Sequence, residues 1–420
     1  VFGVDPALAL VRWKLIAPGG QVLFDRIFNC CGGVDPGVYT LPEAGVYTIR
    51  VGESNDPGTG AYGFTLWNVP PPDRFGIAVG DTISDGVPGP GAGHIESPGV
   101  KDIYTFSATA GQQVYFDLFG VDPALASVNW KLIAPDGAVL FDRILNCCGG
   151  ADPGVYTMEA GGVYTITVGD DRDADTGVYG FTLWNVPPPD KFGIAVGDTI
   201  TNGAPGPGAG HIESPGVKDI YTFNATAGQQ VFFDLFGVDP ALASVNWKLE
   251  APDGAVLFDR ILNCCGGADP GVYTLEAGGV YTITVGDDRD ASTGTYGFTL
   301  WNVPPPDTFG IAVGDTISDG VPGPGAGHIE SPGVKDIYTF SATAGQQVYF
   351  ALSGVPPALV QVNWKLEAPD GEVLFNRILN CCGGADPGEY TLAQAGVYTI
   401  TVGDDRDAGT GTYSFELRAP

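Results

Sequence analysis

The sequence repeats itself with a period of 117 residues, and this period limits what the chain can fold into. An acidic stretch that follows Gly52 recurs behind Gly169, Gly286 and Gly403. The 420 residues therefore hold three full copies and one partial copy of a single unit. Each full copy is long enough to bury a core of its own. We expect a partial domain at 1–69 and full domains at 73–186, 190–303 and 307–420.

Apolar and polar residues alternate within every copy. Tyr164, Ile166 and Val168 alternate with threonines, and a second alternating run leads to the prolines at 187–189. This pattern of two strands and a turn recurs at 45–72, 279–306 and 396–420. No stretch shows helical periodicity, and turn signals separate the short strands. The sequence predicts an all-β fold of tandem antiparallel β-sandwich domains, jelly-roll or immunoglobulin-like, in a linear or superhelical array.

Proline-rich segments join the copies. The runs at 70–72, 187–189 and 304–306 favour extended polyproline II geometry, so we expect semi-rigid linkers. The fourth copy diverges most, with Arg418-Ala419-Pro420 where the others have Trp-Asn-Val, and we interpret it as a terminal cap.

The first copy matches only the later part of the unit. Phe2-Gly3-Val4-Asp5-Pro6 corresponds to residues 119–123, and about 45 residues that open every other copy have no counterpart. Two interpretations stay open. The chain is a piece of a longer protein, or a neighbouring molecule supplies the missing strands.

The charge balance excludes several classes of partner. The chain has 19 basic and 49 acidic residues, a net charge of -30, which disfavours nucleic acid and anionic membrane surfaces. No run of 18 apolar residues exists, so we expect no membrane insertion. An acidic surface suits an extracellular or cell-surface protein, where divalent cations are abundant.

Each copy carries one pair of adjacent cysteines. The pairs are Cys30-Cys31, Cys147-Cys148, Cys264-Cys265 and Cys381-Cys382. A bridge between sequence neighbours is strained, because consecutive Cα atoms are only about 3.8 Å apart. Bridges to another domain or another chain, strained bridges within a pair, and free thiols are three open possibilities. The first would cross-link a fibre covalently.

The acidic loop concentrates carboxylates, which are the ligands that Ca²⁺ prefers. The candidate metal ligands are Asp170, Asp171, Asp173, Asp175, Asp287, Asp288, Asp290, Asp404, Asp405 and Asp407. The alternative is a solvated acidic loop, since the spacing matches no EF-hand or nonapeptide calcium repeat. No other cofactor is expected. Neither His-Glu-x-x-His nor Gly-x-Ser-x-Gly occurs, so we expect no enzyme.

The repeat resembles the bacterial pre-peptidase C-terminal domain. The resemblance lies in Gly-Val-Lys-Asp-Ile-Tyr-Thr-Phe (99–106), Ala-Thr-Ala-Gly-Gln-Gln-Val (108–114), Asn-Trp-Lys-Leu with its Pro-Asp-Gly turn, and Ala-Gly-Gly-Val-Tyr-Thr-Ile-Thr-Val (160–168). It covers most of every copy. It implies a secreted β-sandwich without catalysis of its own, commonly appended to peptidases or strung along surface proteins, some members of which bind calcium or extracellular matrix. The tandem array and the paired cysteines depart from the usual single appended domain.

Three functions follow as hypotheses. The first is a structural subunit of an extracellular filament, sheath or stalk, whose partners are copies of itself. The second is a calcium-dependent adhesin that binds matrix or glycan. The third is the non-catalytic C-terminal region of a secreted peptidase.

Overall fold

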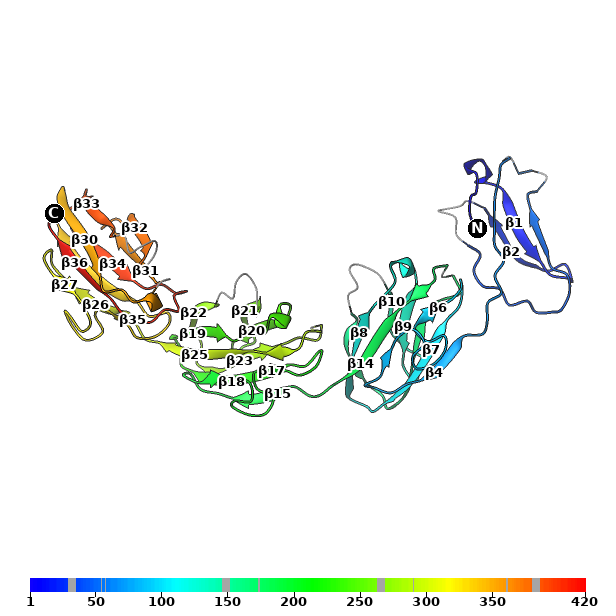
Figure 1. Ribbon diagram of the computed structural model, residues 1–420, viewed down its shortest axis with the longest axis horizontal. Coiled ribbons are helices and arrows are strands. Elements are labelled where there is room, and N and C mark those ends of the chain that lie inside the picture. Colours follow the sequence, from blue (N-terminus) through cyan, green and yellow to red (C-terminus); the bar gives the residue numbers. More distant parts are fainter. Residues whose placement is uncertain are drawn as a thin grey trace. The chain divides into compact units, whose positions relative to one another are not determined.

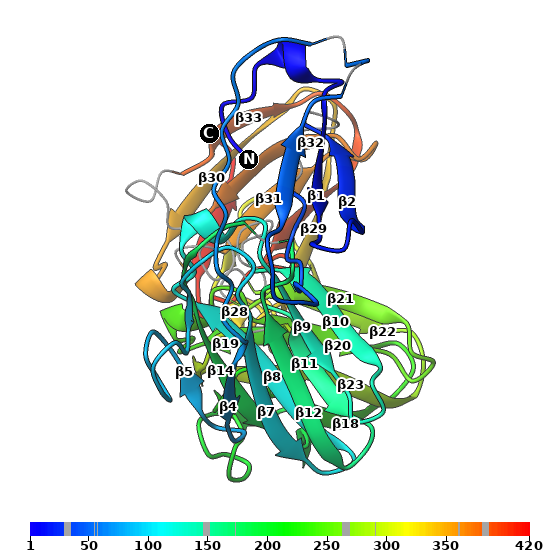
Figure 2. The same cartoon turned by 90° about the vertical axis from the view of Figure 1, so that its right-hand side faces the viewer.

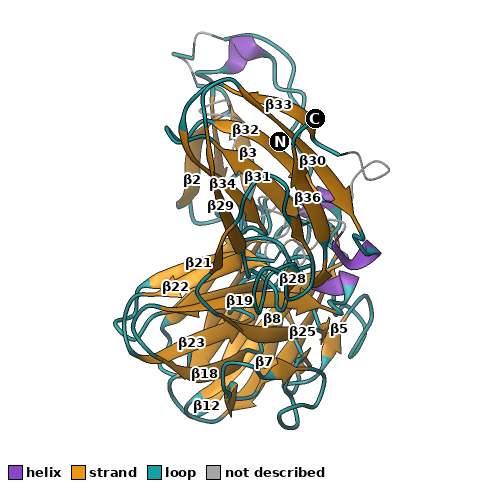
Figure 3. Ribbon diagram, turned by 90° about the vertical axis from the view of Figure 1, so that its left-hand side faces the viewer, coloured by secondary structure: helices purple, strands orange, loops and turns teal. Residues whose placement is uncertain are grey.

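The computed structural model describes residues 1–28, 35–53, 55–56, 58–145, 152–172, 174–262, 269–289, 291–359, 362–379 and 386–420 (Figure 1). Strands form most of its regular structure, and the described helices are short 3₁₀ turns (Figure 3). The all-β expectation is confirmed. Among the described residues, no helix has the length and apolar character needed to cross a membrane. The chain divides into two compact units, Val1–Pro187 and Pro188–Pro420.

The larger sheet of the second repeat has five strands. They are β4 (Asp73–Gly76), β7 (Asp102–Ala108), β9 (Asn129–Ile133), β10 (Val139–Ile144) and β12 (Gly162–Val168). Their order is β10-β9-β12-β7-β4, and only the β4–β7 pair is parallel (Figure 2). Along β7, Tyr104 and Phe106 are buried while Ile103 and Thr105 are half-buried, so the sequence alternation sets which face meets the core.

The smaller sheet has four strands in the order β11-β8-β14-β5. They are β5 (Thr82–Ile83), β8 (Gln112–Phe119), β11 (Gly154–Met158) and β14 (Gly180–Val186). Strand β8 pairs with β11 on one side and with β14 on the other, both antiparallel. A two-stranded ladder of β6 (His94–Ile95) and β13 (Gly177–Val178) and the 3₁₀ turn η2 (Pro123–Leu125) complete the repeat.

One hydrophobic cluster joins the two sheets. It combines Tyr104 and Trp130 of the larger sheet with Phe116 and Phe181 of the smaller one, and each is at most 1% exposed. The Phe116 ring lies 6.3 Å from Trp130, centroid to centroid, in an edge-on arrangement. Burying each such side chain stabilises the fold by about 1.5–3 kcal/mol, so the aromatic residues carry much of the core.

The third and fourth repeats reproduce this arrangement. The third consists of β15 (Asp190–Gly193), β16 (Thr199–Ile200), β17 (His211–Ile212), β18 (Asp219–Ala225), β19 (Gln229–Phe236), η3 (Pro240–Leu242), β20 (Asn246–Glu250), β21 (Val256–Ile261), β22 (Gly271–Leu275), β23 (Gly279–Val285), β24 (Gly294–Thr295) and β25 (Gly297–Val303). The fourth consists of β26 (Asp307–Gly310), β27 (Thr316–Ile317), β28 (His328–Ile329), β29 (Asp336–Ala342), β30 (Gln346–Ser353), η4 (Pro357–Leu359), β31 (Asn363–Glu367), β32 (Val373–Ile378), β33 (Gly388–Leu392), β34 (Gly396–Val402), β35 (Gly411–Thr412) and β36 (Ser414–Arg418). Their sheets have the strand orders of the second repeat.

The first repeat forms only one sheet in its described residues. After the turn η1 (Pro6–Leu8), strands β1 (Arg12–Ile16), β2 (Val22–Ile27) and β3 (Thr48–Val51) pair in the order β2-β1-β3. The second strand expected within 45–72 does not form there, apart from a single bridge between Phe2 and Gly63. Its counterpart β14 pairs mainly with β8, and residues 1–69 contain only the last two positions of that strand, Val1 and Phe2, so most of the segment has no ladder partner within the described residues.

Candidate repeat–repeat interface

The acidic loop after β12 is a structured turn. Asp170 Oδ1 accepts a hydrogen bond from the Arg172 backbone N–H at 2.8 Å. Asp404 and the Arg406 N–H repeat the contact in the fourth repeat at 2.8 Å. A carboxylate that accepts from the backbone two residues later stabilises a tight turn. The first aspartate of the loop therefore has a structural partner within its own chain.

The second aspartate of the loop pairs with the lysine that directly precedes the neighbouring strand of the sheet, which is β7 in the second repeat. Asp171 Oδ1 lies 2.7 Å from Lys101 Nζ, and Asp405 Oδ1 lies 2.6 Å from Lys335 Nζ. Asp288 and Lys218 form the same pair at 2.8 Å. Exposed ion pairs contribute about 0–1 kcal/mol, so their main effect is to hold the loop against the start of the strand.

The later carboxylates of the loop also have partners. Asp175 Oδ2 accepts from the N–H and the hydroxyl of Ser127, at 3.0 and 2.6 Å. Asp407 accepts from the backbone and side-chain amides of Asn363, at 2.8 and 3.1 Å. Burial raises the pKa of Asp407 to about 6.

The structure describes only some of the residues predicted to bind metal or to form cross-links. Asp173, Asp290 and all eight cysteines lie outside the described residues. Among the residues that are described, no group of three or more His, Cys, Asp or Glu side chains could hold a metal ion. Calcium binding at the loop and cross-linking through the cysteines stay predictions.

The loop has a further role that its side-chain pattern does not indicate, which is to contact the preceding repeat. Within the first unit, the carbonyl oxygen of Asp171 accepts a hydrogen bond from the Val38 N–H at 2.8 Å. Within the second unit, the Asp405 carbonyl accepts from the Val272 N–H at 2.7 Å. Val38 and Val272 occupy the same position of the repeat. We call this contact and its surroundings the repeat junction.

Glycine lets the two backbones of the repeat junction approach each other. Gly271 has a φ of +91°, and a Cβ at this position would lie 2.7 Å from the Asp405 carbonyl oxygen. Gly37 has a φ of +87° and the same environment, 2.8 Å from the Asp171 oxygen. Any other residue would bring its Cβ into a clash with the carbonyl oxygen and would have to adopt a left-handed backbone conformation, so only glycine fits here.

The side chain of the junction valine packs against a second glycine, in the following repeat. In the second unit, a Cβ on Gly333 would lie 2.5 Å from Val272 Cγ2 and 3.1 Å from Phe232 Cδ2. Phe232 and Val303 of the third repeat are 0% and 6% exposed and belong to the hydrophobic cluster of the fourth repeat. In the first unit, Gly99 lies against Val38 in the same way. In the second unit the core of one repeat therefore continues into the next.

The corresponding face of the fourth repeat has different chemistry. Glu389 stands at the position of Val272, and Arg418 stands at that of Trp301. The Arg418 guanidinium lies 4.9 Å from the centre of the Tyr349 ring and 3.7 Å from Glu416 Oε2. Charged side chains replace the apolar ones that fill the repeat junction of the third repeat.

A buried carboxylate follows the junction glycine in each complete repeat. Asp102 is fully buried, accepts hydrogen bonds from the hydroxyls of Tyr179 and Tyr104, and leaves Oδ1 without a protein partner. Burial raises its pKa to about 7, against the effect of the Tyr179 hydroxyl, with smaller contributions from Glu96 and Asp73. Asp219 and Asp336 repeat the arrangement, and their pKa values are raised to about 7 for the same reason.

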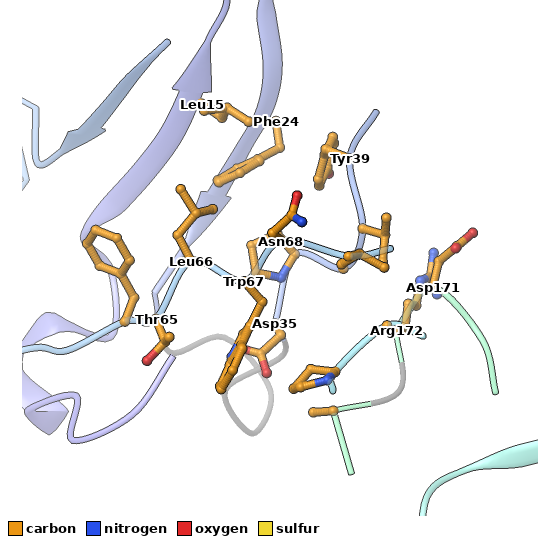
Figure 4. Close-up of a pocket in the computed structure, with 18 of the residues that line it drawn as sticks. Leu15, Phe24, Asp35, Tyr39, Thr65, Leu66, Trp67, Asn68, Asp171 and Arg172 are labelled. Atoms are coloured by element: carbon orange, nitrogen blue, oxygen red, sulfur yellow. The ribbon is translucent and has the colours of Figure 1, made fainter. Parts of the chain in front are cut away.

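The first unit also contains a hollow of about 990 Å³ under the single sheet of the first repeat (Figure 4). Leu15, Phe24 and Leu66 line it, and the loop residues Asp171 and Arg172 stand at its border. The counterparts of these three apolar residues, Leu132, Phe141 and Leu183, are core residues in the second repeat. The hollow therefore occupies the space that a second sheet fills elsewhere.

Comparison with known proteins gives structural likenesses only. No family model matches the sequence, and no curated protein matches it. The chain is similar to the pre-peptidase C-terminal domain of a collagenase from Bacillus anthracis, with 17% identity over 27% of this chain and 98% of that one, at a TM-score of 0.22. For the CUB1-EGF-CUB2 domains of rat MASP-1, the identity is 13% over 55% and 100%, at a TM-score of 0.19. Scores this low carry no inference about activity.

Proposed function

We propose that this protein is a structural subunit of an extracellular filament, sheath or stalk, and that its complete repeats are β-sandwich domains joined in series. The observation that carries the proposal is the recurrence of the repeat junction, with one backbone hydrogen bond and one valine against one glycine in each unit. A contact that recurs with the same residues gives the two repeats of each unit the same relation.

The chemistry of the repeat junction favours a mechanical role over flexible tethering. A linker that merely tethers domains needs no fitted contact between them. Here the buried side chains of Phe232 and Val303 join the core of the next repeat, so separating the repeats would expose apolar surface to water. The head-to-tail contact joins two different surfaces, and such contacts give an open filament when the rotation between neighbours does not close a ring.

Further parts of the proposal come from the sequence. The net charge of -30 keeps such a fibre soluble and repels nucleic acid and anionic membranes. The paired cysteines, one pair in every repeat, would cross-link copies of the chain in an oxidising extracellular setting.

The test is to break the repeat junction and look at the native material. Val272→Asp places a carboxylate against Gly333, whereas Val280→Asp changes a valine that is 50% exposed on β23 of the same repeat. We expect electron micrographs of cells to show long regular polymers for the wild type and for Val280→Asp, and short or irregular ones for Val272→Asp. Cells without polymers, or three indistinguishable samples, would contradict the proposal.

A further inference from the structure

One copy of the repeat completes an acceptor motif for N-linked glycans. Asn224-Ala225-Thr226 of the third repeat has the pattern Asn-x-Ser/Thr, in which x is not proline. The second and fourth repeats have Ser-Ala-Thr at the same positions, 107–109 and 341–343. No other asparagine of the 420 residues is followed two positions later by serine or threonine. The motif therefore occurs once, and one residue of the third repeat creates it.

The fold presents this asparagine to solvent. Phe223 and Ala225 on either side of it face the core and are 1% and 9% exposed, so the alternation of β18 turns Asn224 outward. Strand β23 lies on one side, with Val280 opposite Asn224. Strand β15 lies on the other side, and its pairing with β18 ends at Thr222. Among the described strands, β18 thus has a partner on only one side at Asn224.

The motif ends in an open turn. The Thr226 backbone N–H donates to Gln229 Oε1 at 3.1 Å, and the Gln229 N–H donates to the Thr226 carbonyl at 3.1 Å. Gly228 in this turn has a φ of +80°, and no atom lies within 4 Å of a Cβ placed there. Thr226 itself is exposed. An enzyme that has to reach both Asn224 and the Thr226 hydroxyl therefore meets the end of a strand and an accessible turn.

The asparagine side chain has no structural partner that would explain its presence. Among the described residues, no hydrogen bond or ion pair involves the Asn224 side chain. Serine stands at this position on strands β7 and β29, which have the same burial pattern as β18. The fold therefore accepts either residue, and the amide of Asn224 is available for modification.

We propose that Asn224 carries an N-linked oligosaccharide. In the transfer, Asn224 Nδ2 forms a bond to the anomeric carbon of the first sugar and loses a proton. The bond from that carbon to a phosphate oxygen of a lipid-linked sugar donor breaks, so the lipid phosphate leaves and nothing is oxidised or reduced. The proposal rests on the extracellular location in the proposed function, because Asn-x-Ser/Thr acceptors are used in secreted proteins.

The glycan stands clear of the repeat junction. Asn224 points away from the core on the larger sheet, whereas Val272 and Phe232 of the repeat junction are on strands β22 and β19 of the smaller sheet. The first sugar is within reach of Val280, which is 50% exposed, because the Cβ atoms of opposite residues in a sheet are about 4.5–5.5 Å apart. The glycan therefore covers an exposed apolar side chain of the third repeat without blocking its contact with the fourth.

The experiment is peptide mass spectrometry of the full chain purified from the cells that produce it. Trypsin cleaves after lysine and arginine, so it releases the equivalent peptides 102–131, 219–248 and 336–365 from the three complete repeats. We expect only 219–248 to carry the mass of an oligosaccharide, and fragmentation that retains the sugar should place it on Asn224. The other two peptides have serine at this position and are controls within the same molecule.

Four variants test the motif. Asn224→Ser and Thr226→Ala should each remove the added mass completely, whereas Thr226→Ser, which keeps a hydroxyl group, should retain it. Ser107→Asn completes the motif in the second repeat, and it should add an oligosaccharide of the same mass to peptide 102–131.

Three results would overturn the proposal. They are an unmodified peptide 219–248 in protein recovered outside the cell, an added mass that persists in Asn224→Ser, or the same sugar on all three peptides, which would place it on a shared threonine. An unmodified peptide together with regular polymers in electron micrographs would overturn this proposal and leave the proposed function intact. Protein that stays inside the cell would overturn both, since both require export.

Discussion

The first and second repeats share long identical stretches, such as Trp-Lys-Leu-Ile-Ala-Pro at 13–18 and 130–135, yet only the second forms both sheets. Trp130 packs against Phe116, Phe141 and Phe181, whereas Trp13 packs against Phe24, Phe28 and Phe64 and has no equivalent of Phe116. The five-stranded sheet can form in part without its partner. The second sheet does not form there, because both β11 and β14 take their ladder hydrogen bonds from β8.

The largest expected difference concerns the same leucine in two settings. Leu183→Ala should destabilise the second repeat by about 2–5 kcal/mol, because it leaves a cavity in a closed core. Leu66→Ala should change the first repeat by less than about 0.5 kcal/mol, because that side chain is already in water. Hydrogen exchange of β14 and of β1 measures both. Equal effects would mean that the first repeat is closed in solution.

Stability should depend on pH in the second repeat more than in the first. The folded pKa of Asp102, about 7, lies above its ordinary value of 3.8, so folding favours the protonated form. Stability should therefore fall as pH rises from about 4 to about 7, by on the order of 4 kcal/mol. Asp102→Asn should remove most of this slope in exchange rates measured between pH 5 and 8. Asp152, whose pKa burial also raises, keeps a residual slope in the variant.

Substitutions at the repeat junction should have similar effects in both units. The first repeat, which precedes the junction of the first unit, has only one sheet, whereas the third repeat, which precedes that of the second unit, has both. Gly99→Ala and Gly333→Ala each add a methyl group against a valine and strain a residue with positive φ, which should cost about 1–3 kcal/mol. Distances between spin labels on adjacent repeats should broaden in both variants. Gly111→Ala, at a positive φ with open space around it, controls for backbone strain alone.

The smallest effect should come from the loop ion pair. Lys335→Met removes the partner of Asp405 without touching the Asp405 carbonyl that binds Val272. We expect a loss of about 0–1 kcal/mol that disappears in high salt. Thermal unfolding at low and high salt measures it, and a larger loss that salt does not change would mean that the lysine has a packing role.

The sequence predicted the parts of this structure that follow from local pattern. The alternation of apolar and polar residues predicted strands β7, β9 and β12, because every second side chain of a strand faces the core. The period of 117 residues predicted that these strands would recur in the third and fourth repeats. The β-sandwich arrangement of the sheets and the four-domain division are parts of the proposal.

The repeat junction could not be predicted from alternation, because it depends on backbone atoms. The Asp171 carbonyl, and not its carboxylate, binds Val38, so attention to the charged side chains of the loop missed its contact with the neighbouring repeat. A signal was present in the sequence. Gly37, Gly154, Gly271 and Gly388 recur in every copy, followed by a valine in the first three, and a glycine that recurs at one position indicates close backbone approach.

The buried aspartate was missed for a related reason. Asp102 opens an alternating strand and looks like an ordinary polar boundary residue, whereas its burial depends on Tyr104 and on Tyr179, a residue 77 positions away. No local pattern reports on that pairing. The open first repeat was visible as a gap in the alignment of copies, but the loss of strand structure at 63–69 follows from the absent ladder partner.

Glu389 and Arg418 give one face of the fourth repeat a chemistry that the same face of the third repeat does not have. Where the third repeat offers valine and tryptophan to its successor, the fourth offers a carboxylate and a guanidinium, and the latter is already engaged with Tyr349 and Glu416. A surface such as the one around Gly333, which packs against Val272, would have no hydrogen-bond partner for the Glu389 carboxylate. Two substitutions therefore change what this face can bind, because a surface that docks there has to supply hydrogen-bond partners to Glu389.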